Sequence, residues 1–412
     1  MYITTYTLGC KVNRYETEYL AAALSRLGYT ETPVGESADL VIVNTCTVTT
    51  TSDAKSRKAI RHLAAQHPHA EIVVMGCYAT ANSEQVAAEP NVSEVIVDKQ
   101  DIPEFLRRRG LLVPPRGIDS FGERHRAFLK VQDGCNCRCA YCIIPTVRPN
   151  LSSRPLDDIV DEVRTLVANG FREIVLTGIH LGLYNDSSKR LHDVVGRIVK
   201  IDTEFRLRLS SIEIGEVDDT LLGLMNEYPN KICSHFHLPL QSGSDAVLRE
   251  MRRTYSVAAF VERCKTIKRL LPNIALTTDV IVGFPNESDI DFHASCNTVR
   301  AIGFSKVHVF RYSSRQGTVA AGLPKQIPQP IRQQRSSELT KIANQLRNEY
   351  AQSQIGKRVQ VLLEGQPPLD PGTVEGTADN YLPARLIRQS STIGQLVDAI
   401  VTKVDGELLY AV

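Results

Sequence analysis

Four cysteines within eight residues form the densest group of reactive side chains in the chain. Cys135, Cys139 and Cys142 have the spacing C-x3-C-x2-C, and Cys137 lies between the first two. Three thiolates can hold three irons of a 4Fe–4S cluster and leave the fourth iron without a protein ligand. An iron that is open in this way can bind a cofactor directly. The spacing therefore predicts a catalytic iron–sulfur centre on Cys135, Cys139 and Cys142.

Cys137 keeps a second interpretation open, because four neighbouring cysteines could also close a tetrahedral zinc site. Zinc sites usually combine two C-x2-C pairs from separate segments, and the sequence around this motif has no second pair. We therefore favour the iron–sulfur interpretation and place Cys137 outside the set of ligands.

Three further cysteines occupy equivalent positions in the N-terminal part of the chain. Cys10, Cys46 and Cys77 each follow a strand-like run. The carboxyl ends of parallel strands lie along one edge of a sheet, so the three thiols should converge there. Gly9 and Gly76 would permit a close approach of the backbone. The pattern predicts a shared metal site, although each cysteine alone would more often be an inert buried residue.

The remaining cysteines and two histidines show no ligand spacing. We interpret Cys233, Cys264 and Cys296 as packing residues. His235 and His237 alternate along a strand-like run, and no third ligand is evident nearby. A place in the core or beside a site explains these histidines better than metal binding does.

Alternating strand and helix patterns place the cysteines in two α/β segments. Residues 1–115 predict a doubly wound parallel sheet, and a Pro- and Gly-rich linker follows. Residues 116–352 contain six βα units, which predict an open, partial (βα)6 barrel with the C-x3-C-x2-C motif directly after its first strand. The expected strands are 2–8, 39–44, 71–75 and 94–97 in the first segment, and 127–132, 173–177, 206–210, 235–240, 275–282 and 306–310 in the second.

The last segment, residues 353–412, changes character. Glycines separate short runs in which polar and apolar residues alternate. This pattern predicts a small antiparallel β-barrel.

Composition alone excludes little. The 412 residues carry a formal net charge of +2, which is too small to indicate a nucleic-acid partner by itself. No run approaches the roughly 18 apolar residues of a membrane helix. The first residues read as a strand, so we expect no signal peptide and a cytoplasmic protein. In that compartment the ten cysteines are expected to be thiols or metal ligands and not disulfides.

Together, the motifs resemble those of the radical S-adenosylmethionine methylthiotransferases over essentially the whole chain. The terminal barrel resembles a TRAM domain, which is an RNA-binding module. Within the family, LGCKVN (residues 8–13) and TCTVT (residues 45–49) are similar to the branch that acts on threonylcarbamoyladenosine in tRNA, whereas the isopentenyladenosine branch usually reads GCQMN. The other matching stretches are residues 132–135, 176–180, 209–213, 240–245, 278–285 and 312–318.

The chain departs from the family pattern at a few positions, and none of them is a cysteine of the two sets. After Arg148 the family usually has a glycine, with Arg-Ser-Arg soon after it. Asn286 replaces the usual glycine after Phe-Pro, and Arg311 replaces a common proline. Beside the cysteine loop this chain instead has Pro149, Asn150, Ser152 and Ser153, which bear on the choice of substrate.

The resemblance implies two 4Fe–4S clusters and S-adenosylmethionine as cofactors. The cluster on Cys135, Cys139 and Cys142 would bind S-adenosylmethionine and cleave it to a deoxyadenosyl radical, which removes hydrogen from carbon 2 of the adenosine at position 37 of tRNA. The cluster on the other three cysteines would hold the sulfur to be inserted, and a second S-adenosylmethionine would supply the methyl group. Contacts to the cofactor are expected, by motif position, from Tyr141, Gly178, Ser211, Glu213, Ile281 and Gly283. Without the resemblance, these six would be ordinary barrel residues.

The implied partners are the tRNA anticodon stem-loop, an electron donor and a sulfur donor, with no membrane. Candidates for RNA contact are Arg252, Arg253, Arg385 and Arg388, with Tyr381 as a stacking surface. Two alternatives stay open. One is methylthiolation of isopentenyladenosine or of a ribosomal protein aspartate. The other is a non-catalytic iron–sulfur or RNA-binding scaffold, against which the intact C-x3-C-x2-C motif argues.

Overall fold

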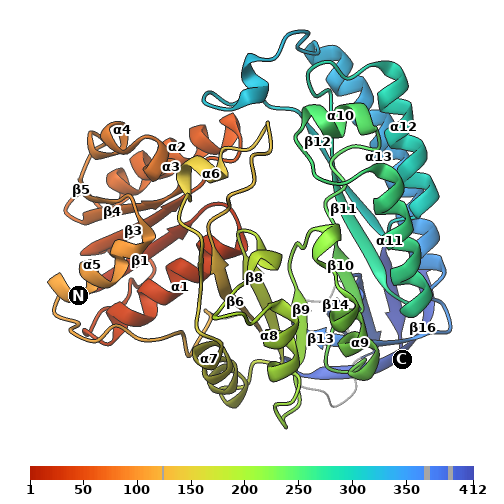
Figure 1. The fold of residues 1–412 in the computed structure, drawn as a ribbon. Helices are drawn as coiled ribbons and strands as arrows, with labels where there is room; N and C mark the ends of the chain where they lie inside the picture. Colours follow the sequence, from red (N-terminus) through yellow and green to blue (C-terminus); the bar gives the residue numbers. More distant parts are fainter. Residues whose placement is uncertain (123–124, 366–371, 388–392) are drawn as a thin grey trace.

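The computed structural model describes residues 1–122, 125–365, 372–387 and 393–412. It has three parts that follow one another along the chain: an α/β layer, an open barrel and a small β-barrel (Figure 1). No helix within these described ranges is long and apolar enough to cross a membrane.

The N-terminal part is a five-stranded parallel sheet with the order β2-β1-β3-β4-β5. Its central strand is buried along its whole length, and separate apolar cores pack on the two faces. This is the doubly wound sheet that the sequence predicts. The strands are β1 (Tyr2–Thr7), β2 (Thr30–Glu31), β3 (Leu40–Thr45), β4 (Glu71–Gly76) and β5 (Val92–Ile96), and the helices are α1 (Lys11–Ser25), α2 (Thr50–Gln66), α3 (Cys77–Ala81), α4 (Ser83–Ala87) and α5 (Ile102–Arg108).

The middle part is an open barrel whose six main strands follow one another around it. Two hydrogen-bonded sheets, β7-β6-β8-β9 and β10-β11-β12, are joined by isolated bridges such as that between Ser211 and His237. Its strands are β6 (Arg126–Asp133), β8 (Glu173–Gly178), β9 (Arg206–Leu209), β10 (His235–His237), β11 (Ala275–Val282) and β12 (Lys306–Arg311), with β7 (Ser152–Ser153) antiparallel to β6.

Helices cover the outer side of this barrel, and α11, α12 and α13 lie along β11 and β12 (Figure 1). The helices are α6 (Ile144–Val147), α7 (Leu156–Ala168), α8 (Leu191–Ile198), α9 (Asp219–Glu227), α10 (Asp245–Glu250), α11 (Val257–Leu270), α12 (Asp289–Ile302) and α13 (Gln329–Gln352). The short 3-10 helices within the described ranges are η1 (Lys99–Asp101), η2 (Leu181–Leu183), η3 (Ile214–Glu216) and η4 (Val319–Gly322).

The C-terminal part is a closed barrel with the strand order β13-β14-β15-β17-β16. Its strands are β13 (Arg358–Leu363), β14 (Thr373–Ala378), β15 (Pro383–Ile387), β16 (Leu396–Asp405) and β17 (Leu408–Ala411). The barrel is not wholly antiparallel, because β15 and β17 pair in parallel where the barrel closes. This is a correction to the sequence prediction, which had no means of pairing strands that are distant in the chain.

The expected strands agree with the observed ones to within a few residues. The largest difference is β10, which ends at His237 although the pattern continues to Leu240. Pro239 follows closely and has no N–H to donate to a ladder, which accounts for the early end. The strands β2 and β7 have two residues each and are too short to leave a pattern.

Candidate functional site

The three N-terminal cysteines meet at one edge of the parallel sheet. Cys10 precedes α1 after β1, Cys46 follows β3, and Cys77 begins α3 after β4. These strands are neighbours in the order β1-β3-β4. Burial raises the pKa of the Cys10 and Cys46 thiols, and the charge of Cys77 adds to both shifts. The structure therefore places the three cysteines at the carboxyl ends of neighbouring strands, along one edge of the sheet.

Two glycines make this convergence sterically possible. Gly9 has a φ of +101°, and a Cβ there would lie 3.2 Å from Sγ of Cys46. Gly76 has a φ of +100°, and a Cβ there would lie 2.3 Å from the carbonyl oxygen of Thr45. The positive φ disfavours a side chain at both positions, and the backbone contacts at Gly76 exclude one. The close approach expected from the sequence is confirmed at these two positions.

Arg148 connects this cysteine set to the open barrel. It lies just after the C-x3-C-x2-C loop, and its Nε donates to Sγ of Cys77 at 3.3 Å. Its two terminal nitrogens donate to both carboxylate oxygens of Glu16 at 2.8 and 2.9 Å. They also donate to Asn13 at 2.9 Å and to Asp133 at 2.8 Å. Arg148 is only 4% exposed, so this is a buried, charged junction between the two parts.

A second arginine makes a similar link near Cys46. Arg315 follows β12, and its guanidinium donates to Asp53 at 2.7 Å and to Thr47 at 2.6 Å. Thr47 is the residue after Cys46 and donates in turn to Asp53 at 2.7 Å. The barrel therefore contacts the N-terminal sheet edge from two sides, next to two different cysteines.

The C-x3-C-x2-C loop leaves β6 through a glycine turn. Gly134 has a φ of +77°, and a Cβ there would lie 2.2 Å from the carbonyl oxygen of Asn150. The Gln132 side chain donates to the Gly134 carbonyl at 2.7 Å and accepts from the His180 N–H at 2.8 Å. Later in the loop, the Ala140 N–H donates to the Met251 carbonyl at 3.0 Å. The loop is thus anchored to three neighbouring segments at the carboxyl end of the barrel strands.

The three predicted ligands lie within one loop of eight residues, and the charges of Cys139 and Cys142 each raise the pKa of Cys135. A hydrogen bond from Cys137 is the larger effect and leaves the pKa of Cys135 below its usual value. Burial raises the pKa of Cys142 to about 11. These shifts describe metal-free thiols, and binding of iron requires the thiolate form.

Cys137 lies beside His180, a contact that the sequence does not predict. Its sulfur lies 3.5 Å from Nδ1 of His180, and the Cys135 sulfur lies 3.6 Å from the same atom. These three groups are near enough to one another to hold an ion. Burial lowers the pKa of His180, but hydrogen bonds to Cys137 and Glu216 outweigh it and raise the pKa to about 10.

Cys139 has a cationic neighbour. Arg253 donates to its sulfur at 3.3 Å and forms an ion pair with Glu213. The Arg253 guanidinium also lies 5.1 Å from the ring centroid of Tyr255. Arg253 was expected to contact RNA, and Glu213 to contact the cofactor. The structure places Arg253 in the interior beside Cys139, with its side chain 8% exposed.

The six residues expected to contact the cofactor lie around the same end of the barrel. Gly178 ends β8, Ser211 and Glu213 follow β9, Ile281 lies in β11, and Gly283 follows β11. Tyr141 packs edge-on against Phe284, with ring centroids 6.5 Å apart. The arrangement faces the cysteine loop from several strands, as expected for a barrel that binds its ligand at the carboxyl ends.

The predicted RNA contacts are dispersed. Arg252 is exposed and has a φ of 59°. Arg385 is 7% exposed and pairs with Glu375. The ring of Tyr381 contacts the Arg208 guanidinium at 4.6 Å and His235 at 5.0 Å, so one surface of it is occupied by the barrel junction. Arg388 lies outside the described residues.

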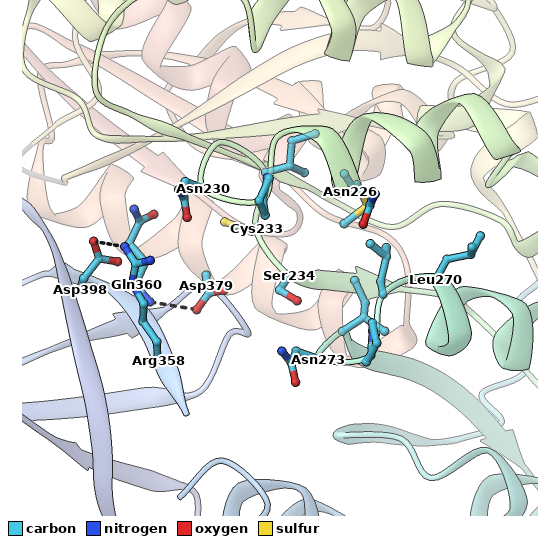
Figure 2. A pocket seen from close by; sticks show the side chains of 16 residues that line it. Asn226, Asn230, Cys233, Ser234, Leu270, Asn273, Arg358, Gln360, Asp379 and Asp398 are labelled. Carbon is cyan, nitrogen blue, oxygen red and sulfur yellow. Dashed lines mark hydrogen bonds and ion pairs between the residues drawn. The ribbon is translucent and has the colours of Figure 1, made fainter. Parts of the chain in front are cut away.

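A cavity of about 400 Å³ lies at the other end of the barrel, against the C-terminal β-barrel. Figure 2 shows its polar lining, including Asn226, Asn230 and Asn273. Arg358 pairs with Asp398 across one side. The segments before β10 and β11 line it, so it opens at the amino ends of strands whose carboxyl ends face the cysteine loop. This cavity is not the site of the two cysteine sets.

Both cysteine sets fit an iron–sulfur cluster by their donor chemistry. All ten cysteines are free thiols. Each set offers three sulfur atoms, and one sulfur of each set accepts a hydrogen bond from an arginine. A cluster held by three thiolates is anionic, and these two guanidinium groups offset that charge. The sequence offered no signal for the contacts of Arg148, Arg253 and Arg315, because each depends on residues distant in the chain.

Two family models match successive parts of the chain. Residues 2–98 match the model described as "Uncharacterized protein family UPF0004", and residues 129–299 match "Radical SAM superfamily". The first match contains Cys10, Cys46 and Cys77, and the second contains Cys135, Cys139 and Cys142.

Curated relatives match nearly the whole chain. The threonylcarbamoyladenosine tRNA methylthiotransferase MtaB of Bacillus subtilis is 35% identical, over 97% of this chain and 94% of its own length. The tRNA-2-methylthio-N(6)-dimethylallyladenosine synthase of Oceanobacillus iheyensis is 31% identical, over 96% of this chain and 81% of its own. Among solved structures, the radical S-adenosylmethionine methyltransferase TsrM from Kitasatospora setae has a TM-score of 0.58 at 14% identity and covers 78% of this chain and 77% of its own. That likeness concerns the fold alone.

Proposed function

We infer the reaction from the family to which this chain belongs, the radical S-adenosylmethionine tRNA methylthiotransferases of the MtaB branch. We propose that the enzyme converts N6-threonylcarbamoyladenosine at position 37 of tRNA into its 2-methylthio derivative. The observation that carries this proposal is the meeting of two three-cysteine sets at one junction, where Arg148 contacts Cys77. Two adjacent sites suit a reaction that needs both radical formation and sulfur insertion.

We propose that Cys135, Cys139 and Cys142 hold the first 4Fe–4S cluster, and Cys10, Cys46 and Cys77 the second. When bound, the first cluster supplies reductive cleavage of S-adenosylmethionine, and the second supplies a place for the sulfur that is inserted. Carbon 2 of adenine has no acidic hydrogen, so radical chemistry is needed there. The protein's own task is to hold the cofactor in place and to exclude side reactions.

The residues around the first set suit that task. Arg253 places a positive charge at Cys139 and is itself held by Glu213. Gly178 and Gly283 let the strand ends pack closely against the side chains of Gln132 and Arg332, and Ser211 is exposed there to donate a hydrogen bond. Tyr141 and Ile281 offer apolar surface for an adenine ring. These roles belong to the proposal.

We propose that the substrate is a tRNA anticodon stem-loop. The reaction would take place in the cytoplasm. Loop bases can be turned out and stacked on aromatic or arginine side chains. The exposed Arg252 is beside the first cysteine set in space, because the preceding Met251 carbonyl accepts from the loop residue Ala140. We assign the C-terminal β-barrel, which resembles a TRAM domain, to RNA binding. An electron donor and a sulfur donor complete the set of partners.

One observation keeps isopentenyladenosine in tRNA as a second candidate substrate. Relatives named for the dimethylallyladenosine product are 31% identical over nearly the whole chain. The difference of four percentage points from the first MtaB relative favours the threonylcarbamoyl substrate.

The proposal is tested by mass spectrometry of tRNA nucleosides from cells that carry or lack the gene. We expect 2-methylthio-N6-threonylcarbamoyladenosine only when the gene is present, and the unthiolated nucleoside when it is absent. A change confined to the isopentenyl nucleosides would identify the second substrate instead.

A further inference from the structure

Three side chains that can bind a metal meet in the open barrel, outside the two cysteine sets. His237 lies in β10, Asp279 in β11 and His308 in β12, and these strands are neighbours in one sheet. Asp279 and His308 are register partners. The ligand atoms of the three residues all lie within 4.8 Å of one another. The sequence shows no third ligand near His237 because the other two residues come from strands that are distant in the chain.

The three residues face the space that the proposed function gives to the cofactor. Side chains alternate along a strand, so Asp279 points to the same side of β11 as Ile281. The opposite side of β11 packs in the apolar core through Val280 and Val282. The side chain of Asp279 is 28% exposed and that of His237 is 14% exposed. A small ion that enters the barrel can therefore reach both groups.

The hydrogen bonds of the His237 ring leave its Nε2 as the atom that can bind a ligand. The Thr277 hydroxyl donates to the Phe236 carbonyl at 3.3 Å, so its oxygen is available to accept. This oxygen lies 2.9 Å from Nδ1 of His237 and accepts the hydrogen bond from that nitrogen. Nε2 then faces the Asp279 carboxylate at 3.3 Å. A protonated Nε2 would donate to a carboxylate at a shorter distance, about 2.7–2.9 Å.

The Asp279 carboxylate lacks the partners that such a group usually has. Among the described residues it accepts no hydrogen bond, and its one ion-pair contact is His237. Partial burial of the His308 ring lowers its pKa, although the charge of Asp279 opposes this shift, so the ring is neutral at pH 7 and has a lone pair to offer. A carboxylate and two imidazole lone pairs that face one another repel unless a cation lies between them.

We propose that His237, Asp279 and His308 bind one divalent transition-metal ion, with Zn²⁺ as the preferred ion. Two imidazoles and one carboxylate suit Zn²⁺, with bonds of about 2.0–2.2 Å. Two ligands of a tetrahedral ion are then about 3.3–3.4 Å apart. The 3.3 Å between His237 and Asp279 agrees with this spacing. His308 is an exposed residue, so its ring can turn to complete the third bond.

This metal site is separate from both cysteine sets and does not rest on the proposed function. Three protein ligands leave the fourth position of the ion for water or for an oxygen of a bound molecule. Asp279 is two residues from Ile281 along β11, which corresponds to about 7 Å. An oxygen ligand of the ion would therefore lie beside the space given to the cofactor.

The competing interpretation is a simple ion pair between protonated His237 and Asp279, which needs no metal. The experiment therefore counts zinc in reconstituted protein, in which iron occupies the cysteine sets. The protein is dialysed to equilibrium against buffered free Zn²⁺, and both metals are measured by inductively coupled plasma mass spectrometry. We expect one saturable zinc per chain in addition to the iron of the clusters.

X-ray absorption at the zinc edge identifies the ligands of that zinc. We expect nitrogen and oxygen neighbours at about 2.0–2.2 Å and no sulfur at about 2.3 Å. This result separates the proposed site from zinc that has replaced iron on the cysteines, because such zinc would have sulfur neighbours.

Variants of the ligands and of one neighbour test the assignment. Asp279→Asn and His308→Ala should each weaken zinc binding by more than about 100-fold, because each changes a direct ligand. Thr277→Val keeps the shape of the side chain but removes the hydroxyl that holds His237, and it should weaken zinc binding by about 10–100-fold. The matched control is His293→Ala, which removes an exposed histidine of α12 and should leave zinc binding unchanged.

Iron content and circular dichroism of each variant must match wild type. If Asp279→Asn fails this requirement, His308→Ala decides, because its exposed position leaves no buried gap. Three results would overturn the site: no saturable zinc in the wild-type protein, equal zinc binding by wild type and both ligand variants, or a zinc shell made of sulfur. An iron beyond those of the clusters that is lost in both ligand variants would support the site and identify Fe²⁺ as its ion.

Discussion

The Nε atom of Arg148 lies 3.3 Å from the sulfur of Cys77, although the two residues belong to different parts of the molecule. The same guanidinium holds Glu16 in the N-terminal part and Asp133 in the barrel. Burial opposes its charge, but Glu16 and Asp133 hold the pKa of Arg148 well above its usual value, so it is always charged. Arg148 thus joins the two parts at Cys77, and Arg315 joins them near Cys46.

Arg148→Met should destabilise the protein by up to about 3–5 kcal/mol, because the buried Glu16 and Asp133 would lose one of their two cations and keep Lys130. Urea unfolding at neutral pH measures this change. Arg116→Met is the matched control, since Arg116 pairs with Asp158 at a position where its side chain is 85% exposed, and it should change stability by less than about 0.5 kcal/mol.

The same variant should change the electronic spectrum of a cluster bound by Cys77, because the sulfur loses its hydrogen bond. Arg148→Lys keeps the charge and should restore part of the stability. A lysine ammonium does not reproduce the paired hydrogen bonds of the guanidinium to Glu16. An Arg148→Met protein as stable as wild type would show that the junction does not depend on this residue.

Cys137→Ala should keep the full iron content, about eight irons for two 4Fe–4S clusters. It should also keep reductive cleavage of S-adenosylmethionine, because the open iron must stay free of a fourth protein ligand. Iron analysis and 5′-deoxyadenosine production measure the two properties. The variant tests the assignment directly, because Cys137 lies close enough to Cys135 and His180 for these three groups to hold an ion. Loss of half the iron in this variant would place Cys137 among the ligands.

The two cysteine sets should separate by function. Cys139→Ala should abolish both 5′-deoxyadenosine and methylthio product. Cys46→Ala should keep cofactor cleavage and lose only the methylthio product. Removing a ligand can unfold a metal site, so circular dichroism must first show that each variant is folded. A folded Cys46→Ala protein with full methylthio product would contradict the division.

Glu173 should hold the C-terminal β-barrel against the open barrel. It is fully buried and binds Arg206 and Arg208, whose guanidinium groups also donate to the carbonyls of Thr377 and Asp379. Glu173→Gln should lower the free energy of unfolding at pH 7 by about 3–5 kcal/mol, since two buried cations lose their anion. Asp161→Asn, in an exposed pair with Arg164, is the control and should have little effect.

The pH dependence of that difference follows from the charge of Glu173. Burial would raise the pKa of this carboxyl, but Arg208, Arg206 and Arg126 hold it well below its usual value. Its contribution is therefore complete above the unfolded pKa of about 4.3 and is lost as the pH falls through the lower folded value. The gap between wild type and Glu173→Gln should shrink below about pH 4. A gap that stays constant from pH 7 to about 3 would contradict this assignment.

Sequence periodicity was sufficient for the order of the elements, although not for the parallel pairing of β15 with β17. It also predicted the sheet edge that Cys10, Cys46 and Cys77 share, because parallel strands bring their carboxyl ends to one edge. It was not sufficient for contacts between the parts. Arg253 reads as a surface charge in the sequence, yet it is buried beside Cys139. Arg148 reads as a loop residue, yet it contacts both parts of the molecule. Such contacts depend on how two folded units meet, and local patterns carry no information about that.

The central claim is methylthiolation of threonylcarbamoyladenosine, and a competition reaction tests it most directly. Reconstituted protein, S-adenosylmethionine, a reductant and sulfide are incubated with equal amounts of two anticodon stem-loops, one carrying threonylcarbamoyladenosine and one carrying isopentenyladenosine. Nucleosides are then measured by mass spectrometry. We predict that the 2-methylthio product forms on the threonylcarbamoyl loop in large excess, together with 5′-deoxyadenosine. Product on the isopentenyl loop alone, or on neither loop while 5′-deoxyadenosine accumulates, would contradict the claim.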